Sequence, residues 1–279
     1  MRAGFCRLTL VPLLLVFCAR GRAADSPSAA PLVAGTPPLL ARAFDAFLEG
    51  QQRWAYTESS TSFEPDGRSH HVSDIRVDPS QPYDQQFVPL QIIGRPPTEK
   101  EIKQWARGGE QLAKRRHAAA ERLAGSAQEA DFRLQLFDEE VTPDLSRATL
   151  TAEDETSATF TIPLHQAGGP DALEYTVFEL TARISKITDQ FQQATFRQRA
   201  TVRVGAGKKS DGLLEVEFGT PDTRFPAIPV KLSWRSINKP LFGPAHPSRS
   251  EKVRTNLRRV KPYDERFQVK LAPLKLLEL

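Results

Sequence analysis

Alternation of apolar and polar side chains is the feature that most constrains the fold of this 279-residue chain. After residue 131, apolar residues take every second position in one short run after another, as in 178–184. This period is typical of strands that bury one face and expose the other. About ten such runs, separated by turn clusters rich in Gly, Pro and Asp, predict an antiparallel meander.

The first helix is predicted near the start of the folded part. Leu40, Phe44, Phe47 and neighbouring apolar residues recur at helical spacing from Pro38 onward. Gly50 is expected to end this helix, because glycine is a poor helix former.

A second helix is predicted over about 98–124. Thr98 and Glu101 have the spacing of a capping box, in which each side chain bonds an unpaired backbone N–H of the first turn. Ile102 and Trp105 then begin an apolar stripe. Two adjacent glycines at 108–109 are expected to break or kink the helix.

Together these elements predict an α+β, mainly β fold. Strands in the second half, with helices confined to the first, favour one long antiparallel sheet over alternating parallel units. A meander of this length should twist and curl into a half-barrel whose concave face the helices cover. Residues 38–279 are expected to form this single domain, and the small, Pro-rich residues 24–37 a flexible spacer.

Residues 1–23 have the pattern of a secretory signal peptide, with early arginines, an apolar run and a small-residue exit. Both cysteines, Cys6 and Cys18, lie in this leader, so a chain processed near Ala24 would have no thiol for a disulfide. Phe17 argues against lipoprotein anchoring at Cys18, since the residue before a lipidated cysteine is small. The chain is therefore expected in the periplasm or outside the cell.

Charge is unevenly distributed along the chain. Acidic residues outnumber basic ones before residue 183, and basic residues predominate after it. The two parts can therefore attract each other within one fold. After the leader, no apolar run approaches the roughly 20 residues that a membrane-spanning helix needs.

An exported leader, an early helix and a long meander resemble the lipoprotein-localisation factors of the LolA and LolB type. Their fold is an incomplete β-barrel that holds acyl chains, so the resemblance implies a half-barrel and an acyl-chain ligand. The segment 92–101, after Trp54-Ala55-Tyr56-Thr57 and Asp78-Pro79, also resembles uncharacterised exported proteobacterial proteins. That group has no established activity, so no functional residue carries over.

Sequence motifs of enzymes are missing. The chain has no zinc-protease, serine-esterase, dinucleotide or P-loop pattern, so it is expected to be non-enzymatic and to need no cofactor. No metal site is expected either, because the adjacent His70 and His71 would point to opposite faces of a strand.

Alternation and helical spacing nominate apolar ligand-binding residues, although side chains in such positions more often form plain core: Trp54, Tyr56, Ile102, Trp105, Phe160, Phe178, Phe218, Val230, Leu232 and Trp234. A second candidate surface comprises Lys252, Arg254 and Arg258, placed on one face of the last strand by alternation. It could bind an anionic membrane surface or an envelope protein, or pair with acids from the first half.

These observations lead to three hypotheses. The first is a non-enzymatic periplasmic carrier or binding protein for a lipid or lipoprotein acyl chain. The second is an envelope interaction or scaffolding protein of the same fold, whose hollow is filled by its own side chains. The third is an exported hydrolase with an unrecognised site. Nucleic acid is not an expected partner in any of them.

Overall fold

The structure is a computed structural model that describes residues 35–125, 134–136, 139–166, 175–199, 201–204, 207–240 and 243–266. Two α-helices are present in these residues, α1 (Pro38–Gly50) and α2 (Glu99–Gly125). Four short 3-10 helices accompany them: η1 (Gln51–Arg53), η2 (Tyr83–Gln85), η3 (Leu145–Arg147) and η4 (Asp264–Arg266). The described strands are β1 (Trp54–Phe63), β2 (Ser69–Val77), β3 (Phe87–Ile92), β4 (Leu134–Leu136), β5 (Glu139–Pro143), β6 (Thr149–Glu153), β7 (Ser157–Gln166), β8 (Tyr175–Ser185), β9 (Gln190–Gln198), β10 (Val202–Val204), β11 (Gly207–Gly219), β12 (Ile228–Lys239) and β13 (His246–Arg259).

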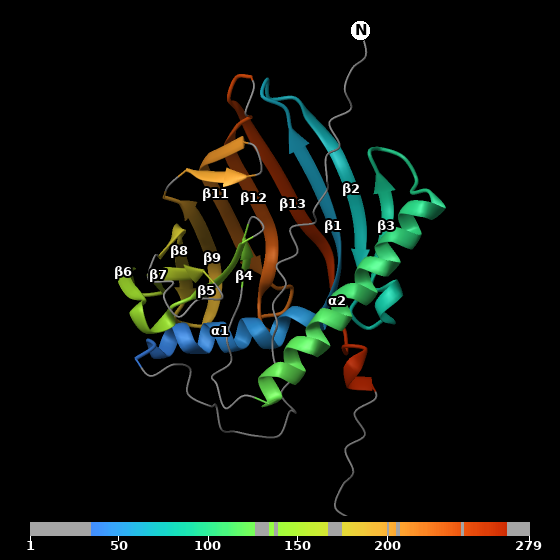
Figure 1. The fold of residues 1–279 in the computed structure, drawn as a ribbon. Helices are drawn as coiled ribbons and strands as arrows, with labels where there is room; N and C mark the ends of the chain where they lie inside the picture. The colour runs from blue at the N-terminus through green and yellow to red at the C-terminus, as the bar shows by residue number, and fades with distance from the viewer. Residues whose placement is uncertain are drawn as a thin grey trace, which may run out of the picture.

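All described strands belong to one antiparallel sheet, as the alternation predicts. Its order is β3-β2-β1-β13-β12-β11-β9-β8-β7-β5-β4, with β10 beside β11 and β6 beside β7. The strands from β7 to β13 follow one another as a meander, and the N-terminal hairpins β1–β3 extend it beyond its last strand. The end strands β3 and β4 do not pair, so the sheet stays open (Figure 1). The predicted α+β, mainly β half-barrel is confirmed.

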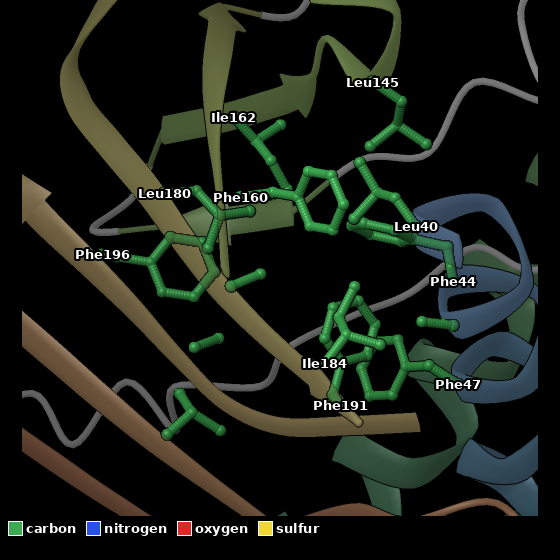
Figure 2. Close-up of a cluster of buried hydrophobic side chains, with 14 of the residues drawn as sticks. Leu40, Phe44, Phe47, Leu145, Phe160, Ile162, Leu180, Ile184, Phe191 and Phe196 are labelled. Carbon is green, nitrogen blue, oxygen red and sulfur yellow. The ribbon is translucent and has the colours of Figure 1, made fainter. Parts of the chain in front are cut away.

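Helix α1 fills one part of the concave side of the sheet. Its residues Leu40, Phe44 and Phe47 are buried against β8 and β9. The Phe191 ring lies edge-on to those of Phe44 and Phe47, with centroids 5.0 Å and 5.8 Å away. Figure 2 shows these side chains meeting Phe160 and other sheet residues. We call the sheet face that packs on α1 the inner face.

Helix α2 begins with the predicted capping box. The Thr98 backbone N–H donates to Glu101 Oε2 at 2.7 Å, and the Glu101 N–H donates to Thr98 Oγ1 at 3.3 Å. The expected break at Gly108–Gly109 is wrong, because the helix runs through both residues. Gly109 allows a close approach instead: a Cβ there would lie 2.1 Å from the Tyr83 carbonyl oxygen.

The two helices lie over different parts of the sheet. Helix α2 packs on η2 and on β3 at the edge of the sheet, whereas α1 packs on β8 and β9. In Figure 1 α1 extends toward β6–β9, and α2 runs diagonally beside β3. The inner face under α1 is therefore closed by one helix.

The predicted signal peptide and most of the spacer lie outside the described residues. Neither helix in the described part is long and apolar enough to cross a bilayer.

Replacing Phe44 by alanine tests the contribution of α1. The free energy of unfolding should fall by about 3 to 5 kcal/mol, the usual cost of truncating a buried phenylalanine. Gln193, exposed on β9, provides the control, and Gln193→Ala should change it by less than about 0.5 kcal/mol. Urea denaturation measures both. Equal effects would mean that α1 is a peripheral helix.

Candidate functional site

The inner face changes from apolar to charged at β13. In the register between β12 and β13, Leu232 lies directly opposite Lys252, and opposed residues of antiparallel strands point to the same face. Leu232 is buried in the core under α1. Lys252, and Arg254 two residues on, therefore point to that same face.

On β1, the next strand, Glu58 lies opposite Arg254. Its side chain is only 11% exposed and accepts from two cations. Lys252 Nζ donates to Glu58 Oε1 at 2.9 Å, and Arg254 Nε donates to Oε2 at 3.0 Å. A buried carboxylate is thus shared by two cations of the neighbouring strand.

Arg254 is also held by its apolar and backbone surroundings. Its guanidinium lies over the Tyr56 ring, 4.5 Å from the centroid, and Nη1 donates to the Pro229 carbonyl at 3.2 Å. We call Tyr56, Glu58, Lys252 and Arg254 the charged strip. It lies between Leu232 on one side and Ile75 of β2 on the other. Buried apolar side chains therefore flank the charged ones.

Electrostatics keep Glu58 ionised. Burial raises the pKa of Glu58, but attraction and hydrogen bonds from Lys252 and Arg254 together lower it below its ordinary value. The strip carries two cations and one carboxylate, and therefore one net positive charge. It can attract an anionic group while adjoining apolar surface.

A β-bulge in β13 changes which later arginine shares this face. Thr255 lies opposite Thr57, and Arg258 lies opposite Ala55, so β13 advances three residues while β1 advances two. Asn256, within this step, has a φ of 55°. The extra residue reverses the alternation of β13.

Arg258 is consequently separated from Lys252 and Arg254. It is 68% exposed and pairs with Asp78, its Nη2 lying 3.2 Å from Oδ2. The prediction that these three residues share one face is wrong for Arg258, because simple alternation ignores the bulge. Arg259 takes the inward position instead, opposite Trp54 of β1.

Lys252, Arg254 and Arg258 pair with acidic residues from the first half of the chain, which is one of the expected alternatives. Glu58 binds Lys252 and Arg254, and Asp78 binds Arg258. These three cations were nominated as a surface that binds anionic partners. Each of them already has a carboxylate partner within the chain.

The nominated apolar residues fall into separate groups. Phe160 and Leu232 are buried in the core under α1, and Phe218 and Trp234 pack against that core. Trp54 and Tyr56 lie on β1 beside arginines of β13. The remaining described members are half-buried or exposed on β12 and α2, namely Val230, Ile102 and Trp105, and the Phe178 side chain lies outside the described residues.

Sequence reasoning did not nominate Glu58 or Arg259. A signal for Glu58 was present, because it occupies the same alternating position as Trp54 and Tyr56, which alternation places inward. A charge at an inward position predicts a buried partner. No local pattern marks Arg259, whose orientation depends on the bulge at Asn256.

A second polar cluster joins η2, α2 and η4. The Tyr83 hydroxyl donates to Asp264 and lies 3.0 Å from His117 Nε2. His117 and Asp264 are about half exposed, with side-chain values of 55% and 47%. The cluster fastens η4 to α2, and its exposure fits a structural link better than a site sheltered from water. Within the described ranges, no three His, Cys, Asp or Glu side chains gather to hold a metal.

Comparison of the chain with protein-family models, with curated proteins and with solved structures found no match. The resemblance to lipoprotein-localisation factors therefore stays a prediction.

Replacing Glu58 by glutamine leaves Lys252 and Arg254 with no carboxylate. Breaking a buried ion pair in this way should lower the free energy of unfolding by about 3 to 5 kcal/mol. The exposed pair of Arg42 and Asp189, 2.7 Å apart, serves as control. Asp189→Asn should cost no more than about 1 kcal/mol in the same denaturation experiment. Similar costs for the two changes would contradict the importance of the strip.

The same variant should alter the pH dependence of stability. Because the folded-state pKa of Glu58 is lowered, its contribution is complete above the ordinary glutamate pKa of about 4.3 and is lost as pH falls through the folded value. The difference in unfolding free energy between wild type and Glu58→Gln should therefore shrink from pH 7 to pH 3. A constant difference would show that folding does not lower the pKa of Glu58.

Proposed function

We propose that the protein is a non-enzymatic periplasmic binding or carrier protein for a lipid or lipoprotein acyl chain. The observation that carries this proposal is the border on the inner face between cations and half-buried apolar side chains, where Arg254 stacks on Tyr56 and donates to the Pro229 carbonyl beside Val230. An amphipathic ligand with an anionic end can contact both sides of such a border. Its chain would lie on apolar side chains and its charge near the cations.

The open sheet with a helix on its inner face is compatible with the lipoprotein-localisation resemblance. The periplasmic location is supported by the leader pattern of residues 1–23. Apolar surface near the strip is available from Tyr56 and Val230, both half-buried. The proposed ligand region is therefore the charged strip with its immediate neighbours, and the core under α1 is not part of it.

A second candidate is an envelope interaction or scaffolding protein with a self-filled core. The observation that favours it is the packing of Leu40, Phe44 and Phe47 into the inner face, where a carrier would keep a hollow (Figure 2). In this case the charged strip would act only in folding, by joining β1 to β13.

Mass spectrometry of lipids extracted from the purified protein tests the choice. Carrier function predicts a retained lipid or acyl species and micromolar or tighter binding of a fluorescent fatty-acid probe. If the protein retains no lipid and does not bind the probe, the scaffold is favoured.

Tyr56→Ala should weaken probe binding at least tenfold. The change removes an apolar ring from the inner face and leaves Arg254 without its stacking partner. Thr57→Ala is the matched control, since it alters the adjacent residue on the opposite face. Fluorescence titration measures affinity, and thermal unfolding of each variant measures stability. Unchanged affinity in Tyr56→Ala would contradict the proposed ligand region.

A further inference from the structure

Two buried N–H donors on one cross-strand pair have no hydrogen-bond acceptor. Trp54 and Arg259 lie directly opposite each other at the end of the β1–β13 ladder. Trp54 Nε1 and Arg259 Nη1 are both buried, and neither has a hydrogen-bond partner in the described part of the chain. Buried polar groups in folded proteins are almost always paired, so two orphans in one residue pair require a specific explanation.

Aromatic rings enclose the Arg259 guanidinium. Its central carbon lies 4.5 Å from the centroid of Phe225 and 5.6 Å from that of Trp54. The two rings are nearly perpendicular, with centroids 6.3 Å apart. The stacking orients the cation but leaves its N–H groups free to donate in the guanidinium plane.

Arg259 differs from the other arginines of β13 in its charge partners. Arg254 binds Glu58 and Arg258 binds Asp78, whereas no ion pair joins Arg259 to a carboxylate among the described residues. Arg53 lies near Arg259 and has a carboxylate partner of its own, because its Nη2 lies 2.7 Å from Glu265 Oε1.

The electrostatic surroundings agree with this geometry. Burial lowers the pKa of Arg259, and the positive charge of Arg53 lowers it further, while the charges of Glu49 and Glu265 oppose the shift. A negative charge placed between the orphaned donors would relieve both the desolvation and the repulsion.

We propose that Trp54 and Arg259 form a binding site for an oxyanion, a phosphate or carboxylate group whose oxygens accept from Trp54 Nε1 and Arg259 Nη1. Two fixed N–H donors, one of them charged, match the separate acceptor atoms of an oxyanion better than they match a halide. Two sources can supply this anion, a free molecule or the charged end of an amphiphile on the neighbouring strip. The second source rests on the proposed carrier function, and the first does not.

Access to this site requires a local movement. Both donor atoms are closed to solvent, and Phe225 stacks on the guanidinium. Phe225 is half-buried on the loop between β11 and β12, where its backbone N–H donates to the Asp222 carbonyl at 3.1 Å. Phe225 is the ring that would have to move for an anion to reach the guanidinium from this side.

Nuclear magnetic resonance of the indole N–H groups tests the site directly. The chain has three tryptophans, so three indole signals are expected, and Trp54→Phe identifies one of them. Inorganic phosphate added to the ¹⁵N-labelled full chain at constant ionic strength should shift the Trp54 signal saturably, whereas chloride should not. No shift, or an equal shift with chloride, would overturn the proposal.

Two further variants separate binding from folding. Arg259→Gln should weaken phosphate binding at least tenfold, while Arg258→Gln, which alters the adjacent exposed arginine, should leave it unchanged. Should Arg259→Gln fail to fold, Trp54→Phe keeps an aromatic side chain at this position and removes the indole N–H together with the five-membered part of the indole. The rise in Tm caused by phosphate should then be smaller than in wild type. An undiminished rise would overturn the site.

A short-chain phosphatidic acid distinguishes the two sources of the anion. If it binds at least tenfold more tightly than inorganic phosphate, and Tyr56→Ala removes that advantage, the anion is the end of an amphiphile. Equal affinities identify a site for free anions. Phosphate binding without binding of any acyl probe would keep the oxyanion site and reject the carrier function, so the two proposals can fail separately.

Discussion

The pairing of β1 with β13 is the interaction on which the rest of the structure depends. It attaches the N-terminal hairpins to the end of the meander and so makes one sheet from distant segments of the chain. Glu58 and Arg254, which face each other across this pairing, are 196 positions apart. It also brings the acidic first part of the chain against the basic second part. Because β13 is made last, β1 must wait for the end of the chain before it can pair, and such non-local contacts are typical of slow folding.

The inner face combines two kinds of stabilisation that respond differently to conditions. Under α1, interlocked aromatic side chains such as Phe44 and Phe191 contribute through apolar burial, which salt and pH affect little. At β13 and β1 the stabilisation depends on the ionisation of Glu58, and on the enclosure that limits screening of its partners. The apolar packing under α1 therefore provides the share of the stability that varies less with pH and salt.

Local patterns predicted the elements well and their contacts less well. The first helix follows from the spacing of Leu40, Phe44 and Phe47, and the start of α2 follows from the capping box. The uninterrupted course of α2 could not be predicted, because Gly109 is explained by the approach of Tyr83 from elsewhere in the chain. The orientation of the last arginines could not be predicted either, since one residue with positive φ, Asn256, reverses the alternation. The pairing of β1 with β13 could not be predicted either, because local patterns do not show which distant strands meet.

The open edge at β3 has a consequence for association between copies of the chain. An unpaired edge strand offers backbone groups to any other strand, which makes open sheets prone to aggregation. Three features of β3 oppose this: Pro89 has no N–H to donate, the register is interrupted beside it, and α2 packs against the strand. The sheet can therefore end at β3 without pairing with a strand of another molecule. A closed barrel avoids such pairing because it has no edge strand, whereas here the irregular β3 and its cover by α2 have this effect.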